Sequence, residues 1–239
     1  MPGFEFYSFE SISSTNDKAR EFAGKGMYNL VITAKKQEKG KGRFGREWSS
    51  DIGGLYMTIV LNEKDLEKIR HLTLIASIAV ARSIKTLSKL DAKVKWPNDV
   101  MVNDKKACGI LTEIIHGKEN YALVGIGVNV NTDKFSNSLQ EKATSLKIES
   151  KKAFDIGKLS RLIIKNFSSL YKNYQNKNYK KIIYSWKKLS HTLGEKIRAK
   201  TLSGEFVGKA IGIDEDCNLI MRLENGKTRR IIEADIFVV

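Results

Sequence analysis

The sequence predicts an α+β protein, in which helices flank a central mixed, mostly antiparallel sheet and a small β-barrel follows. Apolar residues recur at helical spacing from Asp65 to Leu90 without Gly or Pro. Four apolar runs separated by short turns follow between residues 93 and 130, as in consecutive antiparallel strands. From Leu193 on, short β runs alternate with SGE, DEDC and ENGK turns, which is typical of a small barrel. Because helices and strands alternate without a regular β-α-β order, a parallel α/β fold is not expected.

The elements expected in chain order are strands at 4–9 and 29–36 with a helix at 16–24 between them, a strand at 54–61, a helix at 65–90, strands at 93–96, 99–103, 107–116 and 120–130, and a helical region at 155–190. Ser14, Thr15 or Asn16 is placed to cap the helix at 16–24. The change of pattern near residue 190 predicts two domains, 1–190 and 191–239.

The composition bounds the class of protein. The chain has 239 residues, of which 41% are hydrophobic and 29% charged, enough to bury a globular core. No apolar stretch reaches the roughly 18 residues of a membrane span, and residues 1–10 lack the order of a secretory signal, so a cytoplasmic protein without a membrane partner is expected. Cys108 and Cys217 are far apart in sequence and form no C-x-x-C motif, which favours buried free thiols.

The net charge of +15 predicts a surface that attracts phosphates, nucleic acid or an acidic partner. Between Lys151 and Ser190 there are eleven Lys or Arg residues and a single acid, Asp155, so this segment supplies ten of the fifteen excess charges. A solvated helix face is the plainer interpretation of such a run. A nucleic-acid-binding module is the alternative.

The stretch EKGKGRFGREWSS at 38–50 is the strongest local signal for a ligand. Its three glycines let backbone amides converge on an anion, and Arg43 and Arg46 offer planar forks for phosphate or carboxylate. Trp48 offers a flat face for a ring. The spacing is not that of a P-loop, and a basic nucleic-acid-binding loop fits the same residues.

Two further motifs point to a site. In GIGVNVN (125–131) the apolar residues alternate with Gly and Asn, so one strand face packs while the other lacks bulk, as where a ligand or a helix approaches closely. In KWPNDV (95–100) the proline holds the preceding tryptophan extended and places Asn98 at a strand start, where its amide can hold a phosphate or belong to an ordinary turn. A few residues later Lys106 enters a β run, pointing either into a cleft or into solvent.

Taken together, five motifs resemble those of biotin protein ligases in order and spacing: SSTND (13–17), QEKGKGRFGREW (37–48), KWPNDV (95–100), KACGIL (106–111) and GIGVNVN (125–131). The segment GKAIGIDEDCNLIMRLENGK (208–227) resembles the SH3-like barrel of that family. The resemblance spans nearly the whole chain and implies the biotin-lipoate ligase fold, which is related to class II synthetases. It also implies a two-step reaction, in which biotin and Mg-ATP give biotinyl-5′-AMP and pyrophosphate, and a lysine of a biotin carboxyl carrier protein then takes the biotin.

The resemblance further implies residue roles. The residues expected to hold biotin are Ser14, Thr15, Asn16, Gln37, Gly40, Lys41, Gly42, Arg43 and Gly109. Those expected to bind ATP are Arg43, Arg46, Trp48, Asn98, Lys106, Asn129, Thr144 and Ser145. Lys106 and Arg43 are expected to be catalytic, by neutralising charge on the carboxylate and α-phosphate. No residue is assigned to a metal, although Mg²⁺ is expected with ATP.

Other implications of the resemblance concern partners and alternatives. Many family members have Arg where this chain has Lys41, so a bidentate contact is lost there. The STN motif begins at residue 14, which leaves no room for the winged-helix domain of bifunctional members, so specific DNA binding is not expected. A homodimer is expected. A lipoate ligase or octanoyltransferase would share the fold and the lysine, but RFGREW together with WPND favours biotin.

Overall fold

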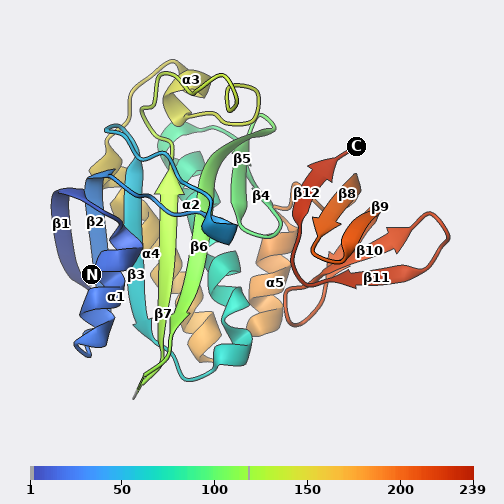
Figure 1. The fold of residues 1–239 in the computed structure, drawn as a ribbon, viewed down its shortest axis with the longest axis horizontal. Helices are drawn as coiled ribbons and strands as arrows, with labels where there is room; N and C mark the ends of the chain where they lie inside the picture. The colour runs from blue at the N-terminus through green and yellow to red at the C-terminus, as the bar shows by residue number, and fades with distance from the viewer. Residues whose placement is uncertain (1–2, 118) are drawn as a thin grey trace.

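The computed structural model describes residues 3–117 and 119–239. A seven-stranded sheet with helices on both faces forms the larger part, and a five-stranded sheet lies beside it (Figure 1). In the described part of the chain, no helix is long and apolar enough to cross a membrane.

The larger sheet has the strand order β1-β2-β3-β7-β6-β5-β4. Its strands are β1 (Glu5–Ile12), β2 (Leu30–Gln37), β3 (Leu55–Asn62), β4 (Ala92–Lys95), β5 (Asp99–Val102), β6 (Lys105–Ile115) and β7 (Tyr121–Val128). β1 pairs with β2 in parallel, and the other neighbours pair antiparallel. The predicted mixed, mostly antiparallel sheet is therefore confirmed.

The two faces of this sheet are covered by different helices (Figure 1). On one face α2 (Arg70–Ser88) packs against the strands, and α4 (Ile156–Gln175) and α5 (Tyr179–Lys187) contact α2. This side holds the main core, in which Phe167 of α4 and Trp186 of α5 are fully buried. On the other face α1 (Thr15–Gly24) packs against β2, β3 and β7 in a smaller core. The long helices thus lie on one side of the sheet and α1 on the other.

Two helical predictions differ from the structure, and one short helix was not predicted. The helix expected at 65–90 begins with a short 3-10 turn, η2 (Leu66–Lys68), before α2 starts. The helical region expected at 155–190 is two helices, because Lys177 takes a left-handed φ of 57° that no α-helix can continue. The short helix α3 (Leu146–Ser150) had no sequence signal beyond Ser145, whose hydroxyl accepts from the Ile148 amide.

The C-terminal region forms a five-stranded antiparallel sheet in the order β11-β10-β9-β8-β12. Its strands are β8 (Lys196–Thr201), β9 (Gly204–Ile213), β10 (Leu219–Leu223), β11 (Thr228–Ile231) and β12 (Asp235–Val238). The predicted small β region is therefore present. It is joined to the larger sheet by a hydrogen bond of 2.9 Å from the Trp96 indole to the Cys217 carbonyl and by pairing of Val94 with Ser190. The division at residue 190 stays a prediction.

Candidate active site

A cavity of about 560 Å³ lies on the α1 face of the larger sheet, and its floor lacks side chains. Gly125 and Gly127 of β7 and Gly109 of β6 form this floor. A Cβ at Gly125 would lie 2.3 Å from Asn16 Oδ1, and one at Gly127 would lie 2.4 Å from Trp48 Nε1. The bare strand face predicted from GIGVNVN therefore makes room for polar and aromatic groups of the site.

Thirteen of the sixteen residues predicted for the site line this cavity: Ser14, Thr15, Asn16, Gln37, Lys41, Gly42, Arg43, Arg46, Trp48, Asn98, Lys106, Gly109 and Asn129. They come from the start of α1, from the strands β2 and β6, from the turn before β5, and from the loops after β2 and β7. Gly40, Thr144 and Ser145 are not among the lining residues. Segments more than 100 residues apart in sequence thus meet in one place.

A hydrogen-bonded polar network closes the α1 end of the cavity. The Thr15 amide and hydroxyl donate to Gln37 Oε1 at 2.7 and 3.0 Å, and Gln37 Nε2 donates to Ser50 Oγ at 2.8 Å. The Thr58 hydroxyl lies 2.6 Å from Asn16 Oδ1 and 2.9 Å from Thr15 Oγ1. Ser14, which caps α1, is buried like Thr15 and Asn16. Side chains fixed in this way hold a neutral polar ligand group without further ordering.

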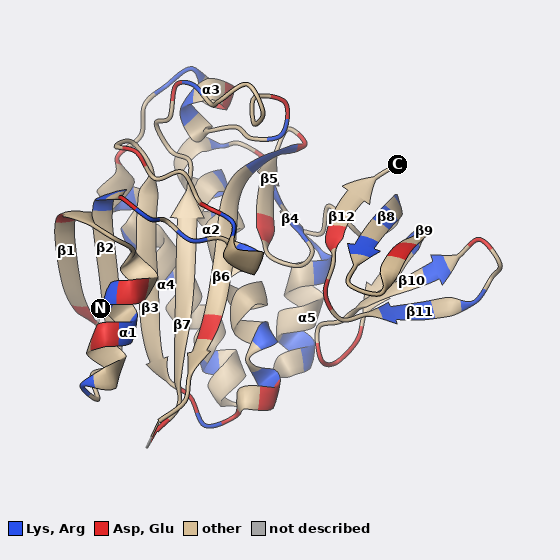
Figure 2. Cartoon of the chain, in the orientation of Figure 1, with Lys and Arg blue, Asp and Glu red and all other residues tan. Residues whose placement is uncertain are grey.

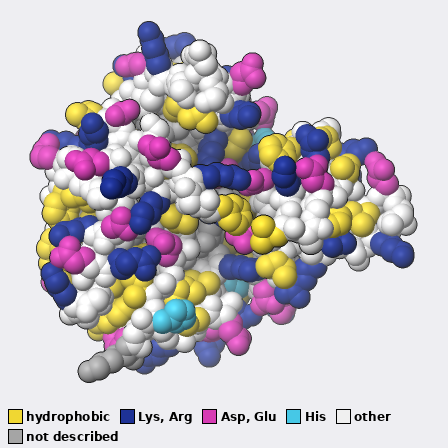
Figure 3. Space-filling model, in the orientation of Figure 1, with side chains coloured by type: hydrophobic (Ala, Val, Ile, Leu, Met, Phe, Trp, Pro, Cys, Tyr) yellow, Lys and Arg dark blue, Asp and Glu magenta, His cyan; other side chains and the backbone are white. Residues whose placement is uncertain are grey.

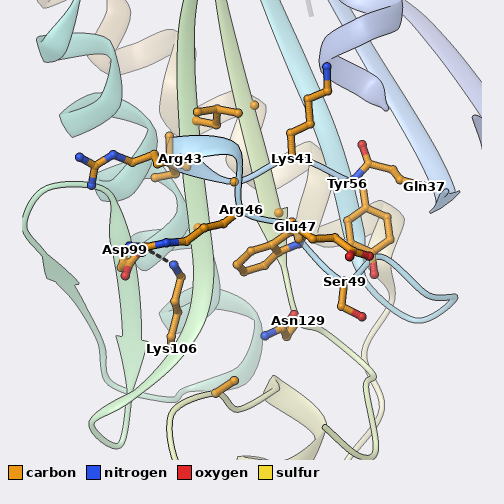
Figure 4. Close-up of a pocket in the computed structure, with 18 of the residues that line it drawn as sticks. Gln37, Lys41, Arg43, Arg46, Glu47, Ser49, Tyr56, Asp99, Lys106 and Asn129 are labelled. Atoms are coloured by element: carbon orange, nitrogen blue, oxygen red, sulfur yellow. Dashed lines mark ion pairs between the residues drawn. The ribbon is translucent and has the colours of Figure 1, made fainter. Parts of the chain in front are cut away.

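Lys106 lies at the other end of the cavity, beside Asp99 (Figure 4). Its ammonium is 2.6 Å from Asp99 Oδ1 and 5.3 Å from the centre of the Trp48 ring. Because only 33% of the Lys106 side chain is exposed, its charge acts in a partly desolvated setting. Asp99 also lies opposite Lys95 in the pairing of β4 with β5. Burial lowers the pKa of the Lys95 ammonium, and the nearby Asp99 charge offsets part of this lowering.

The two arginines of the glycine-rich loop are held by carboxylates of the C-terminal region. Arg43 donates to Asn98 Oδ1 at 3.2 Å and pairs with Glu233 at 2.7 Å. Arg46 makes a bidentate ion pair with Asp235, and this contact holds the pKa of Asp235 below its ordinary value. The planar forks predicted to bind phosphate are therefore occupied here by carboxylate oxygens and, for Arg43, also by an amide oxygen.

The loop itself has a defined conformation in the structure. The Gly42 amide donates to the Arg46 carbonyl at 2.7 Å, and the Trp48 amide donates to the Gly40 carbonyl at 2.9 Å. A Cβ at Gly40 would lie 2.3 Å from the Trp48 carbonyl, which explains why glycine stands there. Lys41 forms a single ion pair with Asp17 of α1.

The loop after β7 is organised by residues that were predicted to bind ATP. Asn129 lines the cavity, but its side-chain amide donates to the Thr144 carbonyl at 3.0 Å. Ser145 Oγ donates to the Thr132 carbonyl at 2.6 Å and caps α3. Both Thr144 and Ser145 are fully buried. In this conformation they shape the cavity wall, and a contact with adenine stays a prediction.

Sequence reasoning missed several lining residues, notably Asp51, Tyr56, Asp99 and Asp235. Asp99 was given no role in the site, and its pairing with Lys106 depends on the register of β5 and β6. Asp235 lies 189 residues from Arg46, so no local pattern reveals the contact. The Tyr56 hydroxyl donates to the Asp51 carbonyl at 2.6 Å, and a strand tyrosine gives no such signal by itself.

A cavity that combines fixed polar groups with a cluster of cations defines a binding site for a small molecule with anionic groups. Comparison with known proteins identifies it further. The family model described as the Biotin/lipoate A/B protein ligase family matches residues 8–131, and the model described as the Biotin protein ligase C terminal domain matches residues 192–239. The chain belongs to the Biotin/lipoate A/B protein ligase family.

Individual relatives agree with this assignment. The chain is 35% identical over 232 residues to a bifunctional ligase/repressor BirA of Bacillus spizizenii, covering 94% of this chain and 71% of that protein. It is 30% identical to a biotin--[acetyl-CoA-carboxylase] ligase of Paracoccus denitrificans, covering 92% of this chain and 95% of that protein. The structure resembles the biotin protein ligase of Aquifex aeolicus in complex with biotin and ATP, with a TM-score of 0.88, 27% identity and full coverage of both chains.

Proposed function

We propose that this chain is a biotin protein ligase, which activates biotin with ATP and transfers it to a lysine of a biotin carboxyl carrier protein. The observation that carries the proposal is the pair of family matches, because the second model, at residues 192–239, is described as the Biotin protein ligase C terminal domain. A lipoate ligase or octanoyltransferase shares the first model but is not favoured by the second. A nucleic-acid-binding module as the main function is likewise not favoured, since the glycine-rich loop belongs to the cavity.

In the first step, a carboxylate oxygen of biotin attacks the α-phosphorus of ATP. A new P–O bond forms, the bond between the α-phosphorus and its bridging oxygen breaks, and pyrophosphate leaves. Negative charge is brought together at the reacting atoms, and the Lys106 ammonium and the Arg43 guanidinium are placed to neutralise it. The Lys106 ammonium would leave its partner Asp99 and pair with the ligand instead. Its task is to neutralise charge, and it forms no covalent bond to the ligand.

In the second step, the amine of the carrier lysine attacks the acyl carbon of the mixed anhydride. The C–N bond forms, the bond to the phosphate oxygen breaks, AMP leaves and the amine loses a proton. A mixed anhydride hydrolyses readily in water, so the glycine-rich loop has to exclude solvent until the carrier arrives. The free-energy cost of ordering the loop is then offset by its contacts with the bound ligands.

The proposed division of the cavity follows its two ends. The neutral network of Thr15, Asn16 and Gln37 would hold biotin, whose polar ring groups are uncharged. The cationic end with Arg46 and Lys106 would hold the nucleotide, where Trp48 offers a ring face.

Mg²⁺ enters this proposal with ATP, as part of the nucleotide substrate. Among residues 3–117 and 119–239 no group of three or more His, Cys, Asp or Glu could hold a metal ion. Mg²⁺ is often held by one or two carboxylates together with substrate phosphates, and Asp51 and Asp99 line the cavity where such a complex would lie. A homodimer and a cytoplasmic location also remain part of the proposal.

Pyrophosphate release tests the proposal. The chain is incubated with Mg-ATP and with biotin, lipoate or octanoate, and the acyl-adenylate is identified by mass spectrometry. We expect biotin to give stoichiometric pyrophosphate in a single turnover, and a carrier domain to make release continuous. Release with lipoate or octanoate but not with biotin would contradict the assignment.

A further inference from the structure

The most basic surface of the molecule does not belong to the cavity. Gly125 and Gly127 face the cavity, while Val124, Ile126 and Val128 face the core that α2, α4 and α5 cover. The helices α4 and α5, which carry seven cations and no acid, therefore lie on the opposite side of the sheet. Figure 2 shows Lys on α5.

The eleven cations of residues 151–190 are all exposed: Lys151, Lys152, Lys158, Arg161, Lys165, Lys172, Lys177, Lys180, Lys181, Lys187 and Lys188. In the part of the chain that the structure describes, the one ion pair that any of them makes is Arg161 with Asp155, at 3.9 Å. Their charge is thus almost uncompensated within the chain.

On α4 the charges form one stripe. At 3.6 residues per turn, Lys158, Arg161, Lys165 and Lys172 fall within an arc of about 60°, opposite the buried face, and span about 21 Å of helix. The apolar side, which includes Phe167, is already buried in the core. A regular stripe of this length can follow a polyanionic backbone.

On α5 the lysines surround an exposed aromatic ring. Tyr184 is 59% exposed, and the Lys188 ammonium lies 4.6 Å from the centre of its ring. Lys180, Lys181 and Lys187 lie on the same side of the helix, within an arc of about 120°. Ile182, Ile183 and Trp186 occupy the buried side. An unburied tyrosine among four lysines combines a stacking face with phosphate-binding charges.

We propose that the α4–α5 face, defined by Tyr184 and by the nine cations Lys158, Arg161, Lys165, Lys172, Lys177, Lys180, Lys181, Lys187 and Lys188, binds single-stranded nucleic acid. The lysines and Arg161 would follow the phosphates, and Tyr184 would stack on a base. A lipid surface fits less well, because the apolar sides of both helices are buried and cannot enter a bilayer. An acidic carrier bound on this face could not present its lysine to the cavity on the other side of the sheet.

Fluorescence anisotropy with the full chain and a labelled single-stranded RNA of about 20 nucleotides tests the proposal. The first variant carries Lys→Gln at 180, 181, 187 and 188. Its matched control carries Lys→Gln at 35, 36, 209 and 227, four exposed lysines elsewhere, so that both variants lose the same charge. Tyr184→Ala and Tyr184→Phe test stacking, and adenylate synthesis by every variant checks that it is folded.

We expect the first variant to bind at least tenfold more weakly than the control, with the slope of log K against log salt reduced by about 3, as for four lost phosphate contacts. Tyr184→Ala should weaken binding about fivefold or more without changing the slope, and Tyr184→Phe should bind like the natural chain. Equal weakening by the two lysine variants, or no effect of Tyr184→Ala, would overturn the proposal.

Competition separates the other polyanions. Polyglutamate and duplex DNA of equal charge should displace the RNA poorly, because neither offers unstacked bases. Vesicles of phosphatidylserine and phosphatidylcholine should capture little protein. If polyglutamate displaced the RNA as efficiently as unlabelled RNA does, the face would bind anions in general. If vesicles captured the protein in a way that depends on the four lysines, the face would bind membranes. Either result would contradict the proposal.

Discussion

At the scale of single residues, the site depends on two glycines, because the absence of their side chains leaves space for neighbouring groups. Gly125 and Gly127 lie in an ordinary strand, so their φ angles do not require glycine. The nearest atoms to an added Cβ belong to Asn16 and Trp48, both of which line the cavity. These two glycines therefore set how closely α1 and the glycine-rich loop approach the sheet.

We predict that Gly127→Ala folds but synthesises adenylate roughly 10- to 100-fold more slowly, because the new methyl must displace the Trp48 indole, 2.4 Å away. Gly212→Ala is the matched control, since a Cβ in that strand meets no atom within 4 Å. Single-turnover pyrophosphate release and thermal unfolding measure both effects. Equal activity of the two variants would show that Trp48 moves at no cost.

A second residue-scale prediction concerns Lys106. We expect Lys106→Ala to lose at least about 100-fold in the rate of adenylate formation, because one aimed charge is removed from the reacting atoms. The neighbouring Lys105→Ala should retain activity, since Lys105 contacts the Gln140 carbonyl and does not line the cavity. Near-normal adenylation by Lys106→Ala would remove this lysine from the catalytic role.

At the scale of elements, the glycine-rich loop and the segment before β12 act on each other. Arg43 and Arg46 reach Glu233 and Asp235, so the start of β12 holds the loop against the larger sheet. Pairs of this kind are partly exposed and stabilise by about 1 kcal/mol or less each. They are weak enough for phosphates to replace the carboxylates as partners.

We predict that trypsin cleaves the chain within residues 38–47 when ligands are absent and that biotin with ATP protects it, because Arg and Lys in a mobile loop are ready tryptic sites. Asp235→Asn should be cleaved faster than the natural chain in the absence of ligand, since Arg46 loses its charged partner. Asp133→Asn, which removes an exposed partner of Lys147, is the control. Gel densitometry follows the cleavage. Equal rates with and without ligand would contradict the ordering of the loop.

The same scale shows what the sequence could and could not predict. Helix and strand positions followed from local periodicity, and motifs with unusual glycine or charge, such as 125–131 and 38–50, marked the cavity correctly. The contact of Arg46 with Asp235 and the break at Lys177 were not predictable. The first depends on how two sheets pack, and the second on a left-handed residue that an unbroken helical pattern conceals.

At the scale of the whole molecule, charge is divided unevenly between two faces. The residues that line the cavity include six cations, Lys41, Arg43, Arg46, Lys106, Lys134 and Lys142, and four acids, Glu47, Asp51, Asp99 and Asp235, a difference of two. On this side Lys and Arg lie among Asp and Glu (Figure 3). The helices α4 and α5, on the other side, carry seven cations and no acid. The net charge of +15 therefore says little about the field at the cavity.

This division leads to a prediction for the transfer step. The net charge of +15 favours an acidic carrier domain, so we expect higher salt to slow biotin transfer to a carrier domain more than it slows adenylate synthesis. Lys→Gln at 180, 181, 187 and 188 should leave transfer unchanged, because α5 packs against α2 on the side of the sheet away from the cavity, and salt screens exposed charges beyond about 8 Å. Stopped-flow transfer from preformed adenylate at several salt concentrations measures both. A selectively slower transfer by this variant would show that the carrier reaches the α4–α5 face, which would then belong to its docking surface.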